Sequence, residues 1–326
     1  MEVKAERNVR QLDRLVVGWD TLVTFSCSQT QEDESNADST HESLSDILVK
    51  VPYIDGDRSI VVFLHVPKAG GTTLEYILNK NYVINRSIHI NAPELEHKPY
   101  LLFKHDIVYD VVMGHHKISS ILYQLLNRPL IHMTMLRDPV HRVISYYDYL
   151  HTYEAHRLHH QVKRMTLQEF SESEEFVELD NAQSRRLVGR LQRQKGQGFQ
   201  GSDKALSITN SSELLHEAKT ILKGRISLFG IVEDYVRFLL MAQQLLRWRD
   251  IYYTHQNVSK QKTDVTKVNQ ATLAVIRQRN QVDLALYNYA KQVFDERCTQ
   301  LGIDQQRVDQ FNTLNGEYQN LVFAHH

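Results

Sequence analysis

A glycine-containing stretch, HVPKAGGTTL at residues 65–74, has the residue types that bind a phosphate group. It follows the apolar run SIVVFLHV and leads into TTLEYILNKNY, an order that predicts a strand, a tight turn and a helix. Gly70 and Gly71 allow backbone N–H groups to converge on an anion at the positive end of the helix. Lys68 precedes these glycines, whereas the lysine of a Walker A loop follows them, and GK[ST] occurs nowhere in the chain. We therefore predict a phosphate-binding loop outside the P-loop nucleotidases.

Two threonines follow the glycines, and their hydroxyl groups could also contact a phosphate. Thr72 and Thr73 open the predicted helix, and Glu75 lies three residues after Thr72. That spacing also fits a capping box, in which the glycines would simply make a turn. A capped helix end can still bind an anion, so both interpretations stay open.

A second candidate phosphate grip lies in TMLRDPVHRVISYY at residues 134–147. Arg137 stands where a strand is predicted to end, and Ser145 lies two turns into the next helix. Asp138 is a suitable N-cap for that helix, with Pro139 at its first position. The bidentate fork of arginine suits a phosphate. The alternative is a salt bridge between Arg137 and an acidic residue.

Two adjacent histidines, His115 and His116, follow Gly114 in VVMGHHKI. An imidazole at the end of a strand could take a proton from an attacking hydroxyl at neutral pH. Either histidine could instead be an ordinary surface or core residue. A zinc site is a weaker alternative, built on three helix-spaced histidines: His156, His159 and His160. No cysteine or glutamate at metal-site spacing supports it, so no metal is expected.

A polar and cationic cluster occupies LDNAQSRRLVG at residues 179–189. It contains Asn181, Gln183, Arg185 and Arg186. These side chains could contact a polar or anionic acceptor. A solvated helix face is an equally good interpretation on chemistry alone.

The elements that would position these motifs alternate along the chain. Apolar strand-like runs, each followed by a helical pattern, occur at SIVVFLHV, DIVYDVVMG, RPLIHMTMLRD and ISLFGIVED. The helical patterns include PVHRVISYYDYLHTYE, YVRFLLMAQQLLRWRD and QVDLALYNYAKQVF. Such alternation predicts an α/β fold with a mainly parallel sheet covered on both faces. Ligands of these sheets bind at the carboxyl ends of the strands, where three of the motifs fall.

Composition divides the chain into a short extension and one large domain. Residues 28–46 are acidic and serine-rich, which predicts a disordered linker within an N-terminal extension, 1–58. The domain would then cover 59–326. Within it, the polar and glycine-containing residues 193–205 predict a mobile loop or lid.

Several classes of partner find no support in the composition. The net charge of −1 gives no reason to propose a nucleic acid. Cys27 and Cys298 are the only cysteines, too few for a disulfide framework, which favours a reducing, cytoplasmic compartment. No uninterrupted apolar stretch approaches the roughly 18 residues of a transmembrane helix.

Two phosphate grips and a histidine, without a Walker lysine, resemble the sulfotransferases that use 3′-phosphoadenosine 5′-phosphosulfate (PAPS). HVPKAGGTTL resembles their 5′-phosphosulfate loop, and TMLRDPVHRVISYY resembles their 3′-phosphate motif. The likeness is to the carbohydrate branch, which includes heparan sulfate 2-O- and 6-O-sulfotransferases and bacterial relatives. DNAQSRRL, FGIVEDY and NQVDLALYNYAKQVF are similar to later motifs of that branch, in the same order. The likeness runs from about residue 59 to about 295.

This resemblance implies a P-loop NTPase-like three-layer fold and specific roles for the matching residues. The 5′-phosphosulfate would lie on the loop formed by Lys68, Ala69, Gly70, Gly71, Thr72 and Thr73. Arg137 and Ser145 would hold the 3′-phosphate. His115 or His116 would be the base, with His115 matching the more frequent bacterial spacing. Lys68 would also stabilise the leaving group.

The acceptor would be a hydroxyl group, and the branch suggests a sugar hydroxyl, contacted by Asn181, Gln183 and Arg185. A lipid, a polyketide-like metabolite or a tyrosine side chain are further possibilities. Golgi members carry a membrane anchor, which this sequence does not show, so a cytoplasmic, bacterial-type enzyme is expected. The rival interpretations are a nucleotide-dependent kinase, a non-catalytic nucleotide-binding protein of the same fold and a zinc-dependent hydrolase. The sequence does not indicate the oligomeric state.

Overall fold

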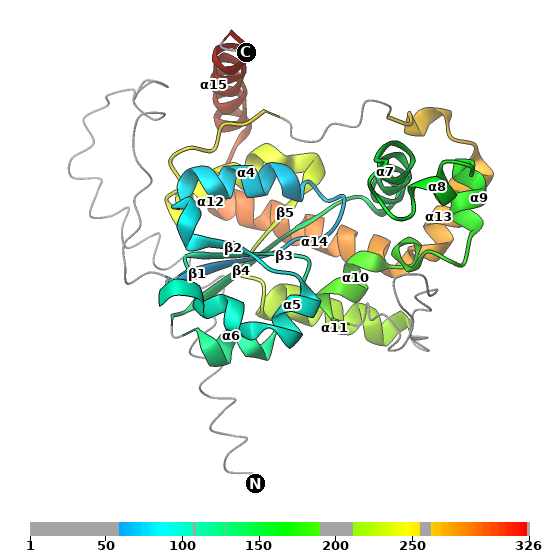
Figure 1. Cartoon of the computed structure of the whole chain (residues 1–326). Helices are drawn as coiled ribbons and strands as arrows, with labels where there is room; N and C mark the ends of the chain where they lie inside the picture. Colours follow the sequence, from blue (N-terminus) through cyan, green and yellow to red (C-terminus); the bar gives the residue numbers. More distant parts are fainter. Residues whose placement is uncertain (1–58, 107–108, 127, 190–210, 255–261, 325–326) are drawn as a thin grey trace.

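The computed structural model describes most of the chain from Ser59 onward (Figure 1). The described residues are 59–106, 109–126, 128–189, 211–254 and 262–324. The predicted N-terminal extension with its acidic linker and the predicted loop at 193–205 lie outside them, so both stay predictions. Cys27 lies outside them too, whereas Cys298 is a buried free thiol.

A five-stranded, all-parallel sheet forms the centre of the fold, in the order β2-β3-β1-β4-β5. Its strands are β1 Ile60–Leu64, β2 Ser87–His89, β3 Val111–Gly114, β4 Leu130–Leu136 and β5 Leu228–Ile231. Four of them confirm predicted strands. The fifth, β2, lies at the edge of the sheet and was not predicted.

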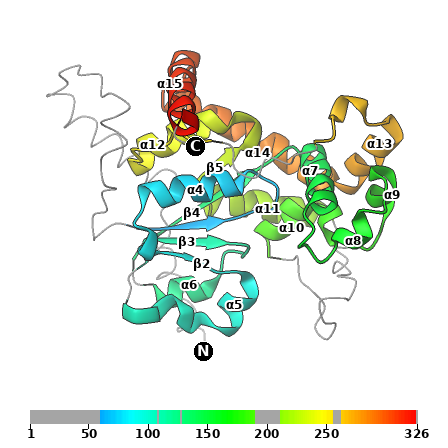
Figure 2. The same ribbon diagram turned by 45° about the horizontal axis from the view of Figure 1, so that its top comes forward.

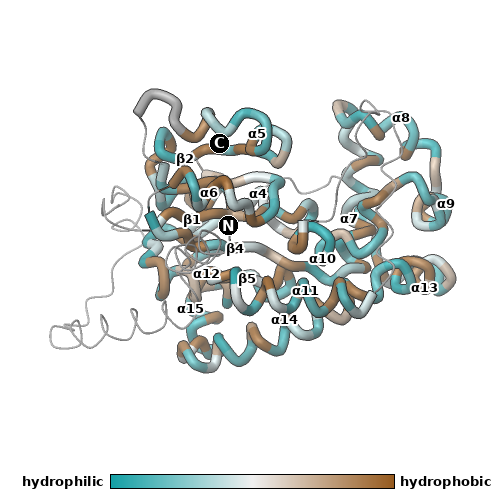
Figure 3. The backbone as a smooth tube through the Cα atoms, turned by 90° about the horizontal axis from the view of Figure 1, so that it is seen from below, coloured by the Kyte–Doolittle hydropathy of each residue, from teal (hydrophilic) through white to brown (hydrophobic). Residues whose placement is uncertain are grey.

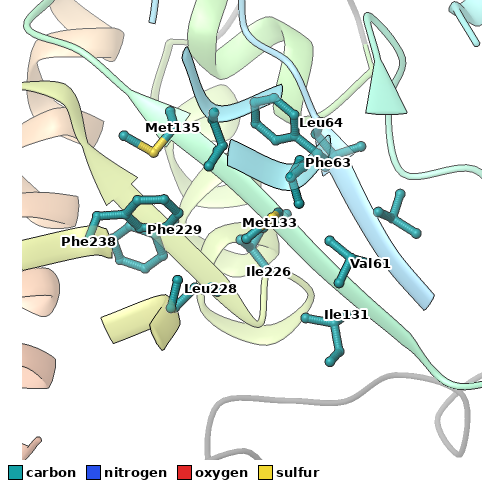
Figure 4. Close-up of a cluster of buried hydrophobic side chains, with 14 of the residues drawn as sticks. Val61, Phe63, Leu64, Ile131, Met133, Met135, Ile226, Leu228, Phe229 and Phe238 are labelled. Atoms are coloured by element: carbon teal, nitrogen blue, oxygen red, sulfur yellow. The ribbon is translucent and has the colours of Figure 1, made fainter. Parts of the chain in front are cut away.

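The central strands are fully buried because helices cover both faces of the sheet. Every residue of β1 and β4 is buried, the pattern expected of a parallel sheet between two helical layers. Figure 4 shows the side chains of Phe63, Met133 and Phe229 in the resulting core. Figure 3 shows hydrophobic strands, whereas the helices alternate between hydrophilic and hydrophobic residues.

Twelve α-helices are found among the described residues, and 3-10 turns join several of them. The helices are α4 Gly71–Asn81, α5 Ala92–His97, α6 Ser120–Leu125, α7 Pro139–Thr152, α8 His159–Val162, α9 Leu167–Glu172, α10 Ala182–Leu187, α11 Ser211–Gly224, α12 Tyr235–Leu246, α13 Gln270–Arg279, α14 Gln281–Gln300 and α15 Gln305–Ala324. The 3-10 turns are η2 Ile84–Arg86, η3 Pro99–Asp106, η4 Val177–Leu179, η5 Val232–Asp234 and η6 Val265–Lys267.

These helices form the outer layers of an α/β sandwich. In Figure 1, α4 and α12 lie on one face of the sheet, and α6 and α11 lie on the other. Figure 2 shows a separate group of helices, α7, α8, α9 and α13, to one side of the sheet. This group has its own hydrophobic cluster, which includes Ile144, Phe170 and Ile276. The predicted three-layer α/β fold is confirmed.

The predicted cap of α7 is confirmed, whereas the capping box considered as an alternative at α4 does not form. The Asp138 carboxylate accepts hydrogen bonds from the backbone N–H groups of Val140 and His141. At α4, the N-cap residue is Gly70, and no side chain caps it. The Glu75 carboxylate instead contacts His65, which follows β1, and His89 of β2. These tertiary partners compete with the local capping geometry.

No helix in the described part of the chain has the length and apolar character needed to cross a membrane.

Candidate active site

The loop between β1 and α4 presents an uncapped helix start at the carboxyl end of the sheet. Gly70 adopts a left-handed conformation with φ 71°, and the first turn of α4 contains no acidic residue. The partial positive charge of the helix start is therefore not offset by a side chain within that turn. Ala69 is fully buried, whereas Thr72 is exposed. This arrangement fits an anion, as predicted for the phosphate loop.

Lys68 occupies a left-handed conformation, which is unusual for a residue with a side chain. Its φ is 65°, and its carbonyl accepts a hydrogen bond from Nη1 of Arg137 at 3.0 Å. Its ammonium lies 4.2 Å from the ring centroid of Tyr149 on α7. Burial and the nearby charge of Arg137 lower the pKa of Lys68 to about 8. Lys68 is therefore mostly charged at neutral pH, and its charge is sensitive to mildly alkaline conditions.

Arg137, the first residue after β4, connects the Lys68 loop to the polar cluster of α10. Its backbone N–H donates to Oε1 of Gln183 at 2.9 Å, and its carbonyl accepts from Nε2 of Gln183 at 2.8 Å. Its Nε is buried without a hydrogen-bond partner and lies 4.0 Å from Glu233. Burial lowers the pKa of this guanidinium. The salt bridge considered as the alternative is thus present, yet Nε lacks a hydrogen bond, and a buried cationic donor beside the loop fits an anionic ligand.

Ser145 is half-buried on α7, one helical turn before Tyr149. Residues four apart lie on the same helix face, so Ser145 is on the side of α7 that Lys68 contacts through Tyr149. The cap at Asp138 fixes the start of this helix directly after Arg137. The two predicted phosphate grips therefore lie next to each other in space, joined by the hydrogen bond from Arg137 to the Lys68 carbonyl.

His115 is held in a defined orientation at the carboxyl end of β3. Its backbone N–H donates to Oδ1 of Asn91 at 3.1 Å, and its ring Nδ1 lies 2.8 Å from the carbonyl oxygen of His65. A carbonyl only accepts, so Nδ1 carries the proton and Nε2 keeps its lone pair. Burial, with a smaller contribution from the charge of His65, lowers the pKa of His115 to about 4. This imidazole is neutral at pH 7 and has a free basic nitrogen.

His116 faces the interior of the protein. Only 8% of it is exposed, its Nδ1 donates to the carbonyl of Lys117 at 3.0 Å, and its Nε2 is buried without a partner. Burial lowers the pKa of His116 to about 4. Its charge also influences the buried His132 of the central strand β4. A ring turned into the core is poorly placed to meet a substrate, so the geometry favours His115 over His116 as the base.

The Gly114 turn is what brings His115 to this position. Gly114 has φ 143°, and a Cβ there would come 2.3 Å from the carbonyl oxygen of Ile90. A side chain would therefore collide with the backbone beyond β2. The turn directs His115 towards His65, and their ring centroids lie 4.5 Å apart.

The predicted acceptor contacts have different surroundings in the structure. Oδ1 of Asn181 accepts the backbone N–H groups of Val282 and Asp283, and the Gln183 amide binds the backbone of Arg137. Both amides thus contact the protein itself. Arg185 is half-buried, with Nε and Nη1 lacking hydrogen-bond partners. Contact of these residues with an acceptor stays a prediction, and Arg185 has the most free donors.

A buried ion cluster supports α10 beside His115. Arg142 of α7 is fully buried, its guanidinium donates to the carbonyl of Glu178, and its Nη1 lies 3.6 Å from the Glu178 carboxylate. Arg186 also pairs with that carboxylate. The charge of Arg186 contributes to lowering the pKa of His115, after burial and His65. The cluster therefore joins α7 and α10 and adds positive charge near His115.

Within the described residues, no three side chains of His, Cys, Asp or Glu are placed to hold a metal ion. Of the histidines in the zinc alternative, His159 is buried, with Nδ1 3.0 Å from the carbonyl oxygen of Leu150.

Sequence reasoning missed three residues that contact the site: His65, Glu75 and Tyr149. His65 directly follows the carboxyl end of β1, as His115 follows that of β3. That shared position in a parallel sheet was the available signal for His65. Glu75 and Tyr149 gave no such signal, because their roles depend on which helix face meets the loop.

The fold and site together define an α/β protein with a glycine-containing loop suited to an anion at the carboxyl ends of its parallel strands and a histidine nearby. The sequence pattern of the sulfotransferase family matches residues 52–290, which is most of the chain. The protein therefore belongs to the sulfotransferase family and is a sulfotransferase. A search of curated proteins found no match.

Proposed function

We propose that this sulfotransferase transfers a sulfuryl group from PAPS to a hydroxyl group of a carbohydrate. The observation that carries the proposal is the hydrogen bond from Arg137 to the Lys68 carbonyl, which joins two separate phosphate grips into one site. PAPS has a 5′-phosphosulfate and a 3′-phosphate, so it needs two such grips. ATP lacks the 3′-phosphate and would leave one of them unused.

The residues fit the sulfate donor by charge and by geometry. The 5′-phosphosulfate would lie at the start of α4, with Lys68 beside it, while Arg137 and Ser145 would hold the 3′-phosphate. Buried nitrogens without hydrogen-bond partners on Arg137 and Arg185 supply donors for anionic oxygens. When bound, the donor supplies an activated sulfuryl group and a stable leaving group, adenosine 3′,5′-bisphosphate.

The chain's own groups would then carry the transfer. Nε2 of His115 accepts the proton of the acceptor hydroxyl as its oxygen forms the new bond to sulfur. Lys68 and the start of α4 stabilise the negative charge that grows on the bridging oxygen as the old S–O bond breaks. The proton passes to His115 and then to solvent, and adenosine 3′,5′-bisphosphate leaves with the electron pair of the broken S–O bond. Positioning and charge stabilisation dominate such a loosely bonded transfer, by analogy with phosphoryl transfer.

A pair of tyrosines at the C-terminal end of α7 supports a ring-shaped acceptor. Tyr149, which lies under the Lys68 ammonium, stacks on Tyr153 with ring centroids 5.2 Å apart and an interplanar angle of 25°. Tyr153 is 48% exposed, so the stack runs from Lys68 towards solvent. Aromatic rings offer flat apolar area together with a polar group, which suits the C–H face and hydroxyls of a sugar. We also propose that the reaction takes place in the cytoplasm, because the low cysteine content suits a reducing compartment.

Mass spectrometry of a cell extract tests the acceptor directly. The extract is incubated with the protein and PAPS, and a parallel sample receives the Lys68→Ala variant as a matched control. We expect a saccharide that gains one sulfuryl group only with the wild-type protein. A sulfated lipid, peptide or other metabolite would refute the carbohydrate acceptor, and no sulfated species in any extract would favour a non-catalytic binding protein.

A further inference from the structure

The carboxylate of Glu75, on the second turn of α4, contacts two histidines of the site. Its Oε1 lies 2.9 Å from Nδ1 of His65 and 3.5 Å from Nε2 of His89. Burial alone would raise the pKa of Glu75, but the hydrogen bonds from both histidines lower it to about 2. The carboxylate is therefore ionised at neutral pH and only accepts, so Nδ1 of His65 carries a proton.

The two histidines bound by Glu75 flank the proposed base. The ring centroid of His65 lies 4.5 Å from that of His115, with the rings tilted by 40°. His89 meets His115 edge-on, with centroids 6.4 Å apart and an angle of 86°. The His65 carbonyl also accepts the Nδ1 proton of His115. Through one carboxylate, α4 thus fixes the side chains that enclose His115 from β1 and β2.

The ring of His65 has apolar and aromatic neighbours, because it stacks on Phe63 with centroids 5.4 Å apart and meets His115 on another side. A Cβ on Gly71 would lie 2.1 Å from Nε2 and Cδ2 of His65, so the ring rests directly on the glycine at the start of α4. Gly71 offers the ring no side chain to hold it. The hydrogen bond to Glu75 is therefore the polar contact that sets its rotation about the Cβ–Cγ bond.

We propose that Glu75 is a positioning residue of the sulfotransferase reaction, which acts by locking His65 and His89 against His115. The proposal rests on the base role of His115 proposed above. Within the described part of the chain, the polar contacts of Glu75 are with His65 and His89, and not with the proposed phosphate grips or the acceptor tyrosines. Its effect on catalysis is expected to pass through the two flanking imidazoles.

The charges around His115 give this arrangement a measurable consequence. The groups that influence His115 are His65, His89 and Arg186, with Glu178 also nearby. The hydrogen bond to Glu75 raises the pKa of His89, and a protonated His89 in turn lowers the pKa of His115. Without the carboxylate, His89 loses its proton more readily, and the pKa of His115 rises.

The test compares Glu75→Gln with wild type, because glutamine keeps the size of the side chain and removes its charge. We expect kcat to fall by about 10- to 100-fold, the scale of a small misplacement of a reacting group. The Kd for adenosine 3′,5′-bisphosphate should stay within about twofold of the wild-type value, because the proposed phosphate-binding residues are unchanged and so is their binding free energy. The matched control is Asn79→Ala, an exposed position one turn further along α4, which should leave both values unchanged.

NMR titration of the histidine imidazoles gives a readout that does not depend on the acceptor. In Glu75→Gln, we expect the pKa of His89 to fall and that of His115 to rise, with the acid limb of kcat/KM moving to higher pH. Unchanged pKa values at both histidines, or unchanged turnover, would overturn the positioning role.

A double mutant separates this inference from the proposed function. If His115 is the base and Glu75 acts through it, Glu75→Gln should cause no further loss in a His115→Ala background. Full activity of His115→Ala would refute the base assignment itself. An inactive His115→Ala with a fully active Glu75→Gln would refute only the positioning role.

Discussion

Removal of the Lys68 ammonium is the most informative single change in the site. Lys68 lies on the loop before α4, directly over Tyr149, and no other lysine is found in this loop. Loss of one preorganised charge stabiliser costs about 3 kcal/mol in transition-state free energy, or about 10²- to 10³-fold in kcat. We therefore expect Lys68→Ala to lower kcat by that factor.

The same change should have little effect on stability. Its main loss in the folded state is the cation–π contact with Tyr149, worth about 0.5–1 kcal/mol. For a domain of this size, that corresponds to a fall in Tm of roughly 1–4 °C. A large loss of turnover with a small change in Tm would locate the effect in the chemistry.

Lys68→Gly separates the lost charge from the strained backbone. Lys68 has φ 65°, a conformation that costs a residue with a Cβ roughly 1–2 kcal/mol relative to glycine. Lys68→Gly should therefore be more stable than Lys68→Ala by about 1 kcal/mol and equally slow. The assays are sulfated-product formation at saturating PAPS and thermal unfolding. Turnover of either variant within about threefold of wild type, far short of the expected effect, would refute the role of Lys68.

Three further predictions follow from the contacts of the site. His115→Ala should lower kcat by about 10²- to 10⁴-fold as the loss of a general base, and if only His116→Ala does so, the base is His116. In a pH profile of kcat/KM for PAPS, activity should fall below about pH 4, because His115 gains a proton there. It should also fall above about pH 8, because Lys68 loses its proton. Constant activity across pH 8–10 would contradict the need for a charged Lys68. Gln183→Leu should raise the Kd for adenosine 3′,5′-bisphosphate by about tenfold, because two hydrogen bonds to the Arg137 backbone are worth roughly 1–3 kcal/mol together, and about 1.4 kcal/mol is tenfold in Kd. An unchanged Kd in calorimetry, with circular dichroism confirming the fold, would show that Arg137 needs no such support.

Sequence patterns predicted the central elements well because those elements are long and strongly hydrophobic. Strands β1 and β4 are continuous apolar runs, and the helix after β4 begins with an N-cap and a proline. The edge strand β2 was missed because its three residues, Ser87–His89, are too few to show a pattern. A strand of that length is recognised only through its pairing with β3.

The candidate site was only partly predictable, because several of its contacts depend on tertiary packing. Glu75 has the spacing of a capping box, yet its carboxylate contacts His65 and His89 from neighbouring strands. The choice between His115 and His116 depends on which ring turns into the core, and the sequence of two adjacent histidines does not indicate this. The contact of Gln183 with Arg137 likewise requires α10 to lie against the end of β4.

The two neighbouring grips should bind a nucleotide with phosphates at both the 5′ and 3′ positions. Isothermal titration calorimetry with adenosine 3′,5′-bisphosphate, adenosine 5′-monophosphate and Mg-ATP tests it most directly. We predict that the 3′-phosphate strengthens binding by about 10- to 100-fold, the value of charge-assisted hydrogen bonds, and that Arg137→Ala removes this difference. Equal affinity for the two adenosine nucleotides, or tighter binding of Mg-ATP, would contradict the account.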